Sequence, residues 1–187
     1  RAIALIPVIL FHAGFKSFSG GYIGVDVFFV LSGYLITSKI LAEKEAGTFS
    51  FIQFYERRAR RILPTLFFVM AVCIPFAWLL MFDPVQFKQF STSLVTVTLF
   101  FSNIQFWQES VYFAPAAELK PLLHTWSLAI EEQYYLIFPV FIVVFWSWGK
   151  RSLVVMLSIV AVLSFLCAQL SGNLTIYPPY IEPEFLW

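Results

Sequence analysis

Long apolar stretches alternate with short polar connections along almost the whole chain. The apolar runs are Ala2–Phe15, Tyr22–Ser38, Ile62–Phe82, Leu94–Trp107, Trp126–Trp148 and Ser152–Leu170. A helix needs about 20 apolar residues to cross a bilayer, and the third, fifth and sixth runs meet that length. The first and fourth runs are shorter, and the fourth is rich in serine and threonine. The pattern predicts an all-α bundle of membrane helices without strand-like alternation, in which the fourth segment is tilted or re-entrant.

The composition supports a polytopic membrane protein. Of the 187 residues, 60% are hydrophobic and 12% are charged, against about 45–50% and about 25% in soluble domains. The net charge of +1 gives no reason to expect a nucleic-acid partner. Cys73 and Cys167 lie in apolar runs and form no disulfide framework. The two histidines, His12 and His124, lack ligand-spaced neighbours, so we expect no metal site.

Basic residues predict how the helices are oriented. The connection between the second and third runs contains Lys39, Lys44, Arg57, Arg58, Arg60 and Arg61. By the positive-inside rule this connection is cytoplasmic, and its second half, SFIQFYERRARRI, has the apolar spacing of a helix on the membrane surface. If all six runs crossed the bilayer, Lys150 and Arg151 would lie outside, against the rule. A re-entrant fourth segment would remove this conflict.

Ionisable side chains in membrane segments are costly and are therefore candidates for function. His12 lies in the first apolar run, eleven residues after Arg1. On a helix the two would be about 20° from the same face and about 16 Å apart along the axis. A histidine suits proton transfer near neutral pH, which makes His12 a candidate general base. The alternative is a buried histidine that only bonds a neighbouring helix.

Three acidic residues are further candidates. Asp26 lies in the glycine-rich stretch GGYIGVDVFFVLSGYLIT, where it either supports helix packing or orients a partner in the site. Glu131 and Glu132 begin the fifth run, and adjacent helix positions differ by about 100°. We therefore expect one glutamate to face the site and the other to be structural, paired with an arginine. The sequence does not decide which.

The arginines at positions 57–61 also have two interpretations. They are either a solvated anchor on the cytoplasmic side or a clamp for phosphate, whose oxygens match the guanidinium fork. Arg58 and Arg61 are three residues apart, so they can converge on one ligand.

Four motifs follow one another along the chain: Arg1 with His12, GGYIGVDVFFVLSGYLIT, FYERRARRILP and LLHTWSLAIEEQYYLIFP. In this order they resemble the motifs of the bacterial acyltransferase 3 family of integral membrane O-acyltransferases. The resemblance covers nearly all of residues 1–187 but about the first half of the family's roughly ten-helix domain. We therefore expect a partial transmembrane domain, truncated at both ends.

The resemblance implies an enzyme of the bacterial inner membrane, in contact with lipid. It would move an acyl group, usually acetyl from cytoplasmic acetyl-CoA, to a hydroxyl of lipopolysaccharide O-antigen, peptidoglycan or an exopolysaccharide. Arg58 and Arg61 would hold the phosphates of acetyl-CoA, and Arg1 would help to place it. His12 would be the general base or a transient acyl carrier. Asp26 or Glu131 would orient the imidazole or balance its charge.

A transporter is the alternative function. Membrane carboxylates and histidines also form proton relays, which would explain His12, Asp26 and Glu131 without any group transfer. It would not explain the arginine pair or the four motifs. A third possibility is a non-catalytic membrane domain with the same fold, and no feature of the sequence supports it.

Overall fold

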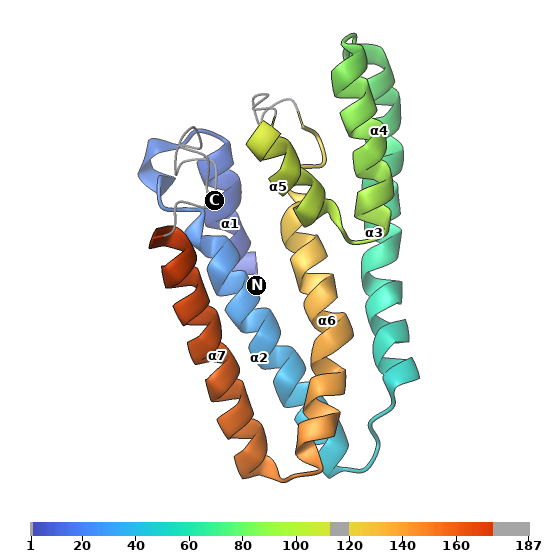
Figure 1. Ribbon diagram of the computed structural model, residues 1–187. Coiled ribbons are helices and arrows are strands. Elements are labelled where there is room, and N and C mark those ends of the chain that lie inside the picture. Colours follow the sequence, from blue (N-terminus) through green and yellow to red (C-terminus); the bar gives the residue numbers. More distant parts are fainter. Residues whose placement is uncertain (1, 113–119, 174–187) are drawn as a thin grey trace. The chain divides into compact units, whose positions relative to one another are not determined.

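The computed structural model describes residues 2–112 and 120–173, and within these ranges the regular structure is entirely helical. The helices are α1 (Ala2–His12), α2 (Ile23–Glu45), α3 (Phe51–Leu80), α4 (Pro84–Thr98), α5 (Ser102–Tyr112), α6 (Thr125–Trp146) and α7 (Lys150–Asn173), with a 3₁₀ turn η1 (Lys16–Phe18) (Figure 1). Of these, α2, α3, α6 and α7 are long and apolar enough to cross a membrane. The predicted all-α fold is confirmed.

The chain forms two compact units, one up to Tyr55 and one from Glu56 onward. In the first unit α1 packs against α2, and glycines allow the two backbones to approach closely. A Cβ atom at Gly21 would overlap the Pro7 carbonyl, and one at Gly24 would overlap the Ala4 carbonyl. The glycine-rich stretch therefore serves helix packing at these two positions.

We expect Gly24→Ala to lower the free energy of unfolding by about 1–3 kcal/mol, the usual cost of overpacking a close contact. The added methyl group would meet the Ala4 carbonyl and lie 2.7 Å from Val8 Cγ2. Gly20→Ala is the matched control, since its Cβ would meet only Ile23 Cδ1 at 4.0 Å. Thermal unfolding of the detergent-purified protein measures both. Equal stability of the two variants would contradict the packing.

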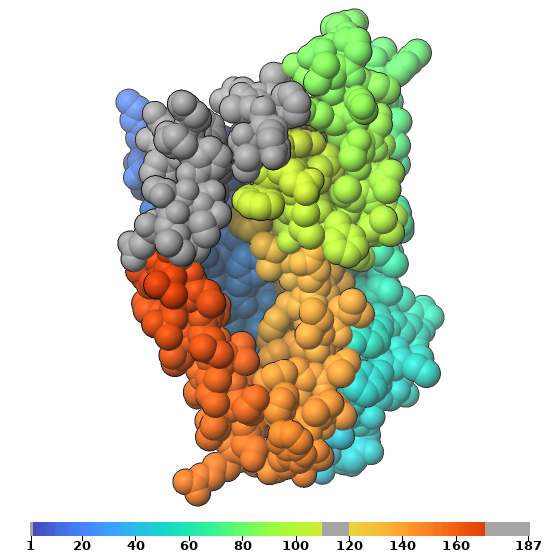
Figure 2. Space-filling model, viewed as in Figure 1, coloured from blue at the N-terminus to red at the C-terminus, as the bar shows by residue number. Residues whose placement is uncertain are grey.

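In the second unit α3, α4, α5 and the start of α6 share an apolar core. Its buried members are Leu66, Met70, Ala77, Phe90, Val97, Phe106 and Leu122. Figure 2 shows α7 (red) joined to α6 (orange) at one end, and every residue from Ala161 to Leu170 is exposed. An apolar helix exposed over that length suits contact with lipid or with further helices.

The fourth apolar run is divided between two short helices. With 15 and 11 residues, α4 and α5 are about 22 Å and about 16 Å long, less than the bilayer core of about 30 Å. They turn back on each other at Phe100, whose φ is 56°. Gln133 Nε2 on α6 donates to the Phe100 carbonyl at 2.7 Å and to Asn103 Oδ1 at 3.1 Å. The segment is therefore a helical hairpin of the re-entrant type.

This hairpin removes the conflict over orientation. Because α4 runs back along only part of α3 and α5 then reverses direction again, α6 is antiparallel to α3 in the second unit. The turn at Lys150 and Arg151 then falls at the end where α3 begins with its arginines (Figure 1). The helix predicted on the membrane surface and the third apolar run form one continuous helix, α3.

Candidate functional site

His12 and Asp26 lie in the first unit. His12 is the last residue of α1, with an exposed side chain and its ring edge-on to Phe11 at 5.2 Å between centroids. Asp26 is exposed in the first turn of α2, where the helix dipole favours a negative charge. Gly21 faces Pro7 and Gly24 faces Ala4, so Asp26 lies level with the start of α1, about ten residues or about 15 Å from His12 along the axis of the pair. A role of Asp26 in orienting the imidazole stays a prediction.

The arginines on α3 differ in their surroundings. Arg60 is exposed and pairs with Glu56 at 2.8 Å. Arg57 and Arg61 are also exposed, whereas Arg58 is half-buried. The Arg58 guanidinium lies 5.2 Å from the centroid of the Tyr135 ring on α6. The structure therefore places Arg58 against α6 and leaves Arg61 at the surface. Arg1 lies outside the described residues.

Both glutamates of α6 are drawn into one charged cluster with Arg58. Glu131 is 8% exposed and accepts a hydrogen bond from the Tyr135 hydroxyl, one turn further along α6. Glu132 interacts electrostatically with both Arg58 and Glu131. The interaction with Arg58 is the one expected of the structural glutamate, and the assignment of Glu131 to the site stays a prediction.

The cluster is not fully satisfied within the described residues. Glu132 Oε1 is buried there without a hydrogen-bond partner. A buried acceptor without a donor costs free energy, so such groups call for a partner of some kind. Two carboxylates against one guanidinium also leave an excess of negative charge if both are ionised. The cluster can therefore accept a proton or a donor group from a ligand or another segment.

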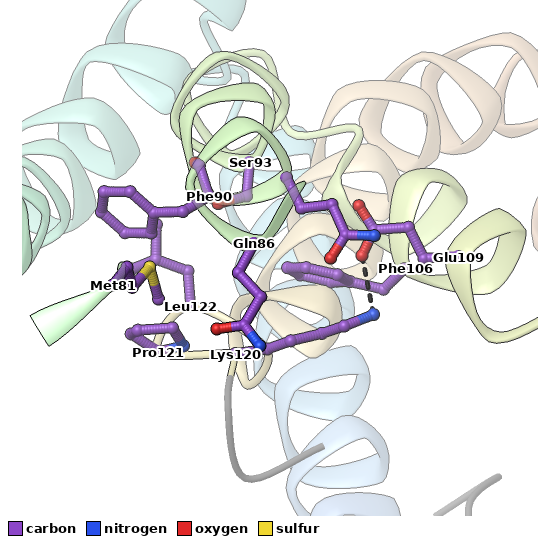
Figure 3. A pocket seen from close by; sticks show the side chains of 10 residues that line it. Met81, Gln86, Phe90, Ser93, Phe106, Glu109, Lys120, Pro121 and Leu122 are labelled. Atoms are coloured by element: carbon purple, nitrogen blue, oxygen red, sulfur yellow. Dashed lines mark hydrogen bonds and ion pairs between the residues drawn. The ribbon is translucent and has the colours of Figure 1, made fainter. Parts of the chain in front are cut away.

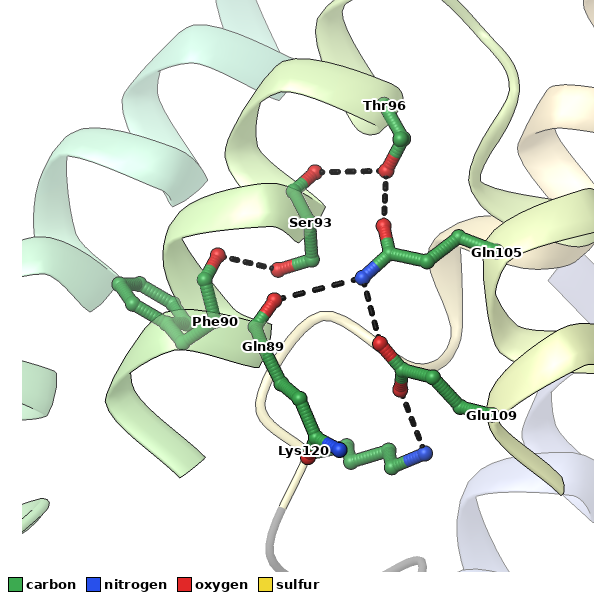
Figure 4. Close-up of polar contacts among 7 residues, drawn as sticks. All are labelled: Gln89, Phe90, Ser93, Thr96, Gln105, Glu109 and Lys120. Atoms are coloured by element: carbon green, nitrogen blue, oxygen red, sulfur yellow. Dashed lines mark hydrogen bonds and ion pairs between the residues drawn. The ribbon is translucent and has the colours of Figure 1, made fainter. Parts of the chain in front are cut away.

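A second polar centre lies where α4, α5 and the segment before α6 meet (Figure 4). Glu109 accepts from Lys120 Nζ at 2.7 Å and from Gln105 Nε2 at 2.7 Å, and both charged side chains are 13% exposed. Gln105 Nε2 also donates to the Gln89 carbonyl at 3.3 Å, while its Oε1 accepts from the Thr96 hydroxyl. This network fixes an ion pair within the core of the second unit.

The ion pair borders a pocket (Figure 3). The lining residues are Met81, Gln86, Gln89, Phe90, Ser93, Phe106, Glu109, Lys120, Pro121 and Leu122. Sequence reasoning missed this site because Glu109 and Lys120 lie outside or at the ends of apolar runs, where charges need no explanation. The serine, threonine and glutamine content of the fourth run was the available signal.

None of the described residues forms a cluster of three or more metal-ligating side chains. The predicted site residues fall in both units: His12 and Asp26 lie in the first, and Arg58, Arg61 and Glu131 lie in the second. Within the second unit, Arg58 and Glu131 belong to the same cluster.

Comparisons with known proteins give a consistent result. A family model described as an acyltransferase domain matches residues 1–187. O-acetyltransferase OatA of Staphylococcus aureus (strain NCTC 8325 / PS 47) is 35% identical over 166 residues, which are 88% of this chain and 27% of that protein. Peptidoglycan O-acetyltransferase OatA of Listeria monocytogenes serovar 1/2a is 40% identical over 153 residues, 81% of this chain and 24% of that protein. The chain spans about a quarter of the length of these relatives. No solved structure matches it.

Proposed function

The chain belongs to the acyltransferase 3 family, and from that premise we propose that it is part of an O-acyltransferase. The enzyme moves an acyl group, acetyl in the first instance, from cytoplasmic acyl-CoA to a hydroxyl of a cell-envelope polysaccharide. Peptidoglycan is the favoured acceptor, because one relative is named for it. The observation that carries the proposal is the family match over all 187 residues. The four long apolar helices favour a multi-pass location, for which we propose the bacterial inner membrane.

The arginine-rich start of α3 supports a donor site on the cytoplasmic side. Four arginines lie between Arg57 and Arg61, and guanidinium groups match phosphate oxygens in charge and geometry. Arg61 is exposed and can reach a phosphate directly. We propose that Arg58 binds the same phosphates from the side that faces α6, so that its guanidinium lies between the phosphates and the carboxylates of α6. Arg1 would help to place the donor.

His12 supplies the proton transfer in this proposal. The imidazole takes the proton of the acceptor hydroxyl, whose oxygen forms the new ester bond as the carbon–sulfur bond of the thioester breaks. The same proton then passes from the imidazolium to the departing thiolate. In the alternative, His12 carries the acyl group for a time before the acceptor takes it. Asp26 or Glu131 would provide negative charge for the imidazolium.

We expect label from acetyl-CoA to appear in envelope polysaccharide when the full-length protein is present in membrane vesicles. The donor is supplied on the side of the α3 arginines, and vesicles without the protein are the control. A transporter would instead move a solute with no acyl donor present. If no acetyl transfer occurs with several acceptors and a solute is taken up without an acyl donor, the proposed enzyme activity is contradicted and a transporter is favoured.

A further inference from the structure

One positive charge serves two carboxylates in the cluster between α3 and α6. Tyr135 follows Glu131 by four residues and Glu132 by three, so it is a neighbour of both on the surface of α6. The Tyr135 hydroxyl donates to Glu131, and its ring centroid lies 5.2 Å from the Arg58 guanidinium. Glu132 interacts electrostatically with that guanidinium and with Glu131. The charge of Arg58 is therefore already engaged before any ligand arrives.

The other charged groups of the elements packed against α6 have different surroundings. Those of α3, α4 and α7 are exposed: Glu56, Arg57, Arg60, Arg61, Lys88, Lys150 and Arg151. On α5, Glu109 is paired with Lys120 at 2.7 Å. On α6 itself, His124 stands eight residues before Glu132, about 12 Å along the axis. Arg58 is therefore the basic side chain that the described contacts place beside Glu132.

The Oε1 atom of Glu132 is the unsatisfied part of this cluster. Among the described residues it is buried and has no hydrogen-bond partner. An ionised oxygen in such a place costs free energy, whereas a protonated carboxyl group is neutral and carries a donor of its own. The side chain as a whole is half-buried, so a proton can reach it from solvent. Glu132 is therefore placed to exchange a proton.

A phosphate bound to Arg58 would change the balance of charge in the cluster. The proposed donor site brings the phosphates of acyl-CoA to Arg58 and Arg61. Two carboxylates and a phosphate would then share one half-buried guanidinium if all of them stayed ionised. Like charges at close range in a poorly solvated place repel each other strongly. Addition of a proton to one carboxylate removes most of that repulsion.

We propose that Glu132 is a positioning residue that couples donor binding to the uptake of one proton. As a phosphate of the donor engages Arg58, a proton from solvent adds to the Glu132 carboxylate, which becomes a neutral carboxyl group. The guanidinium can then turn its donors toward the phosphate. Without the donor, the ionised carboxylate holds Arg58 against α6. This role rests on the proposed function, because it requires that Arg58 binds the donor.

The test measures acetyl-CoA binding to the full-length protein in detergent between about pH 7 and about pH 9, where phosphate stays ionised. Uptake of one proton raises the Kd of the wild type by up to about 10-fold for each pH unit. Glu132→Gln keeps the shape of the side chain but takes up no proton, so its Kd should change far less with pH. At the upper end of the range it should bind about 10-fold more tightly than the wild type.

Two further variants control this measurement. Glu132→Asp keeps a carboxylate and should retain the pH dependence of the wild type. Glu56→Gln is the matched control, because Glu56 is an exposed glutamate of α3 that pairs with Arg60. It should also leave the pH dependence unchanged, and thermal unfolding verifies that each variant is folded.

Isothermal titration calorimetry in buffers of different ionisation enthalpy counts the protons directly. The wild type should take up about one proton more per bound acetyl-CoA than Glu132→Gln, a difference in which titration of the donor's own phosphates cancels. Equal proton uptake and equal pH dependence in these two proteins would overturn the role of Glu132. If the wild type does not bind acetyl-CoA at any pH, the proposed donor site is refuted and this role with it. Glu132-dependent proton uptake without acetyl transfer would refute the proposed transfer reaction alone.

Discussion

His12→Ala is expected to lower the rate of acetyl transfer by about 10²–10⁴-fold, the usual contribution of a general acid–base group. The folded protein should persist, because His12 is exposed at the end of α1 and exposed substitutions usually change stability by about 0.5 kcal/mol or less. The measurement is transfer of labelled acetyl from acetyl-CoA to envelope polysaccharide in vesicles, with thermal unfolding recorded in parallel.

The second histidine of the chain supplies the control for His12→Ala. His124 stands at the start of α6, in the other unit, and His124→Ala should leave the transfer rate nearly unchanged. Full activity of His12→Ala would show that the reaction does not depend on this residue of α1. Equal losses in the two histidine variants would indicate a general effect on the fold.

The same experiment separates the two roles proposed for His12. A transient carrier would leave labelled acetyl on the wild-type protein when no acceptor is present, and His12→Ala would abolish that label. A general base would leave the protein unlabelled in both cases. Transfer that depends on His12 without any protein-bound label would therefore support the general base.

The helices were predictable from the sequence because their signal is local. Apolar runs of bilayer length predicted α6 and α7 closely, but they predicted only the apolar part of α3, which begins eleven residues before Ile62. The hairpin of α4 and α5 was one of two expectations. It depends on Gln133, which bonds the Phe100 carbonyl from 33 residues away in the sequence.

Pairings between helices could not be read from the sequence. The spacing of Glu131 and Glu132 shows that they face different directions, yet a long arginine side chain on α3 interacts with the second of them. The Glu109–Lys120 pair was missed for the same reason, because its partners come together only after the hairpin forms. Spacing along one helix predicted that Arg58 and Arg61 could converge, but α6 gives them different surroundings.

Arg58→Ala is expected to lower the free energy of unfolding by about 1–3 kcal/mol, the usual cost of leaving a partly buried polar group without its partner, since Arg58 and Glu132 are both half-buried. Arg58 lies over the Tyr135 ring and interacts with Glu132, while Tyr135 bonds the buried Glu131. Without the guanidinium, the carboxylates repel each other in a poorly solvated place. Thermal unfolding in detergent measures the loss. Arg60→Ala is the matched control, since its ion pair with Glu56 is exposed and worth about 0–1 kcal/mol.

A second substitution distinguishes this structural role of Arg58 from donor binding. Glu132→Gln removes one of the two carboxylates, so the double variant Arg58→Ala/Glu132→Gln should regain most of the lost stability. If Arg58 also holds a phosphate of acetyl-CoA, the stabilised double variant will still show a raised KM for acetyl-CoA. Recovery of both stability and KM would make Arg58 a partner of α6 alone. Unchanged stability in Arg58→Ala would contradict the cluster itself, because the half-buried Glu132 would lose its neighbouring positive charge at no cost.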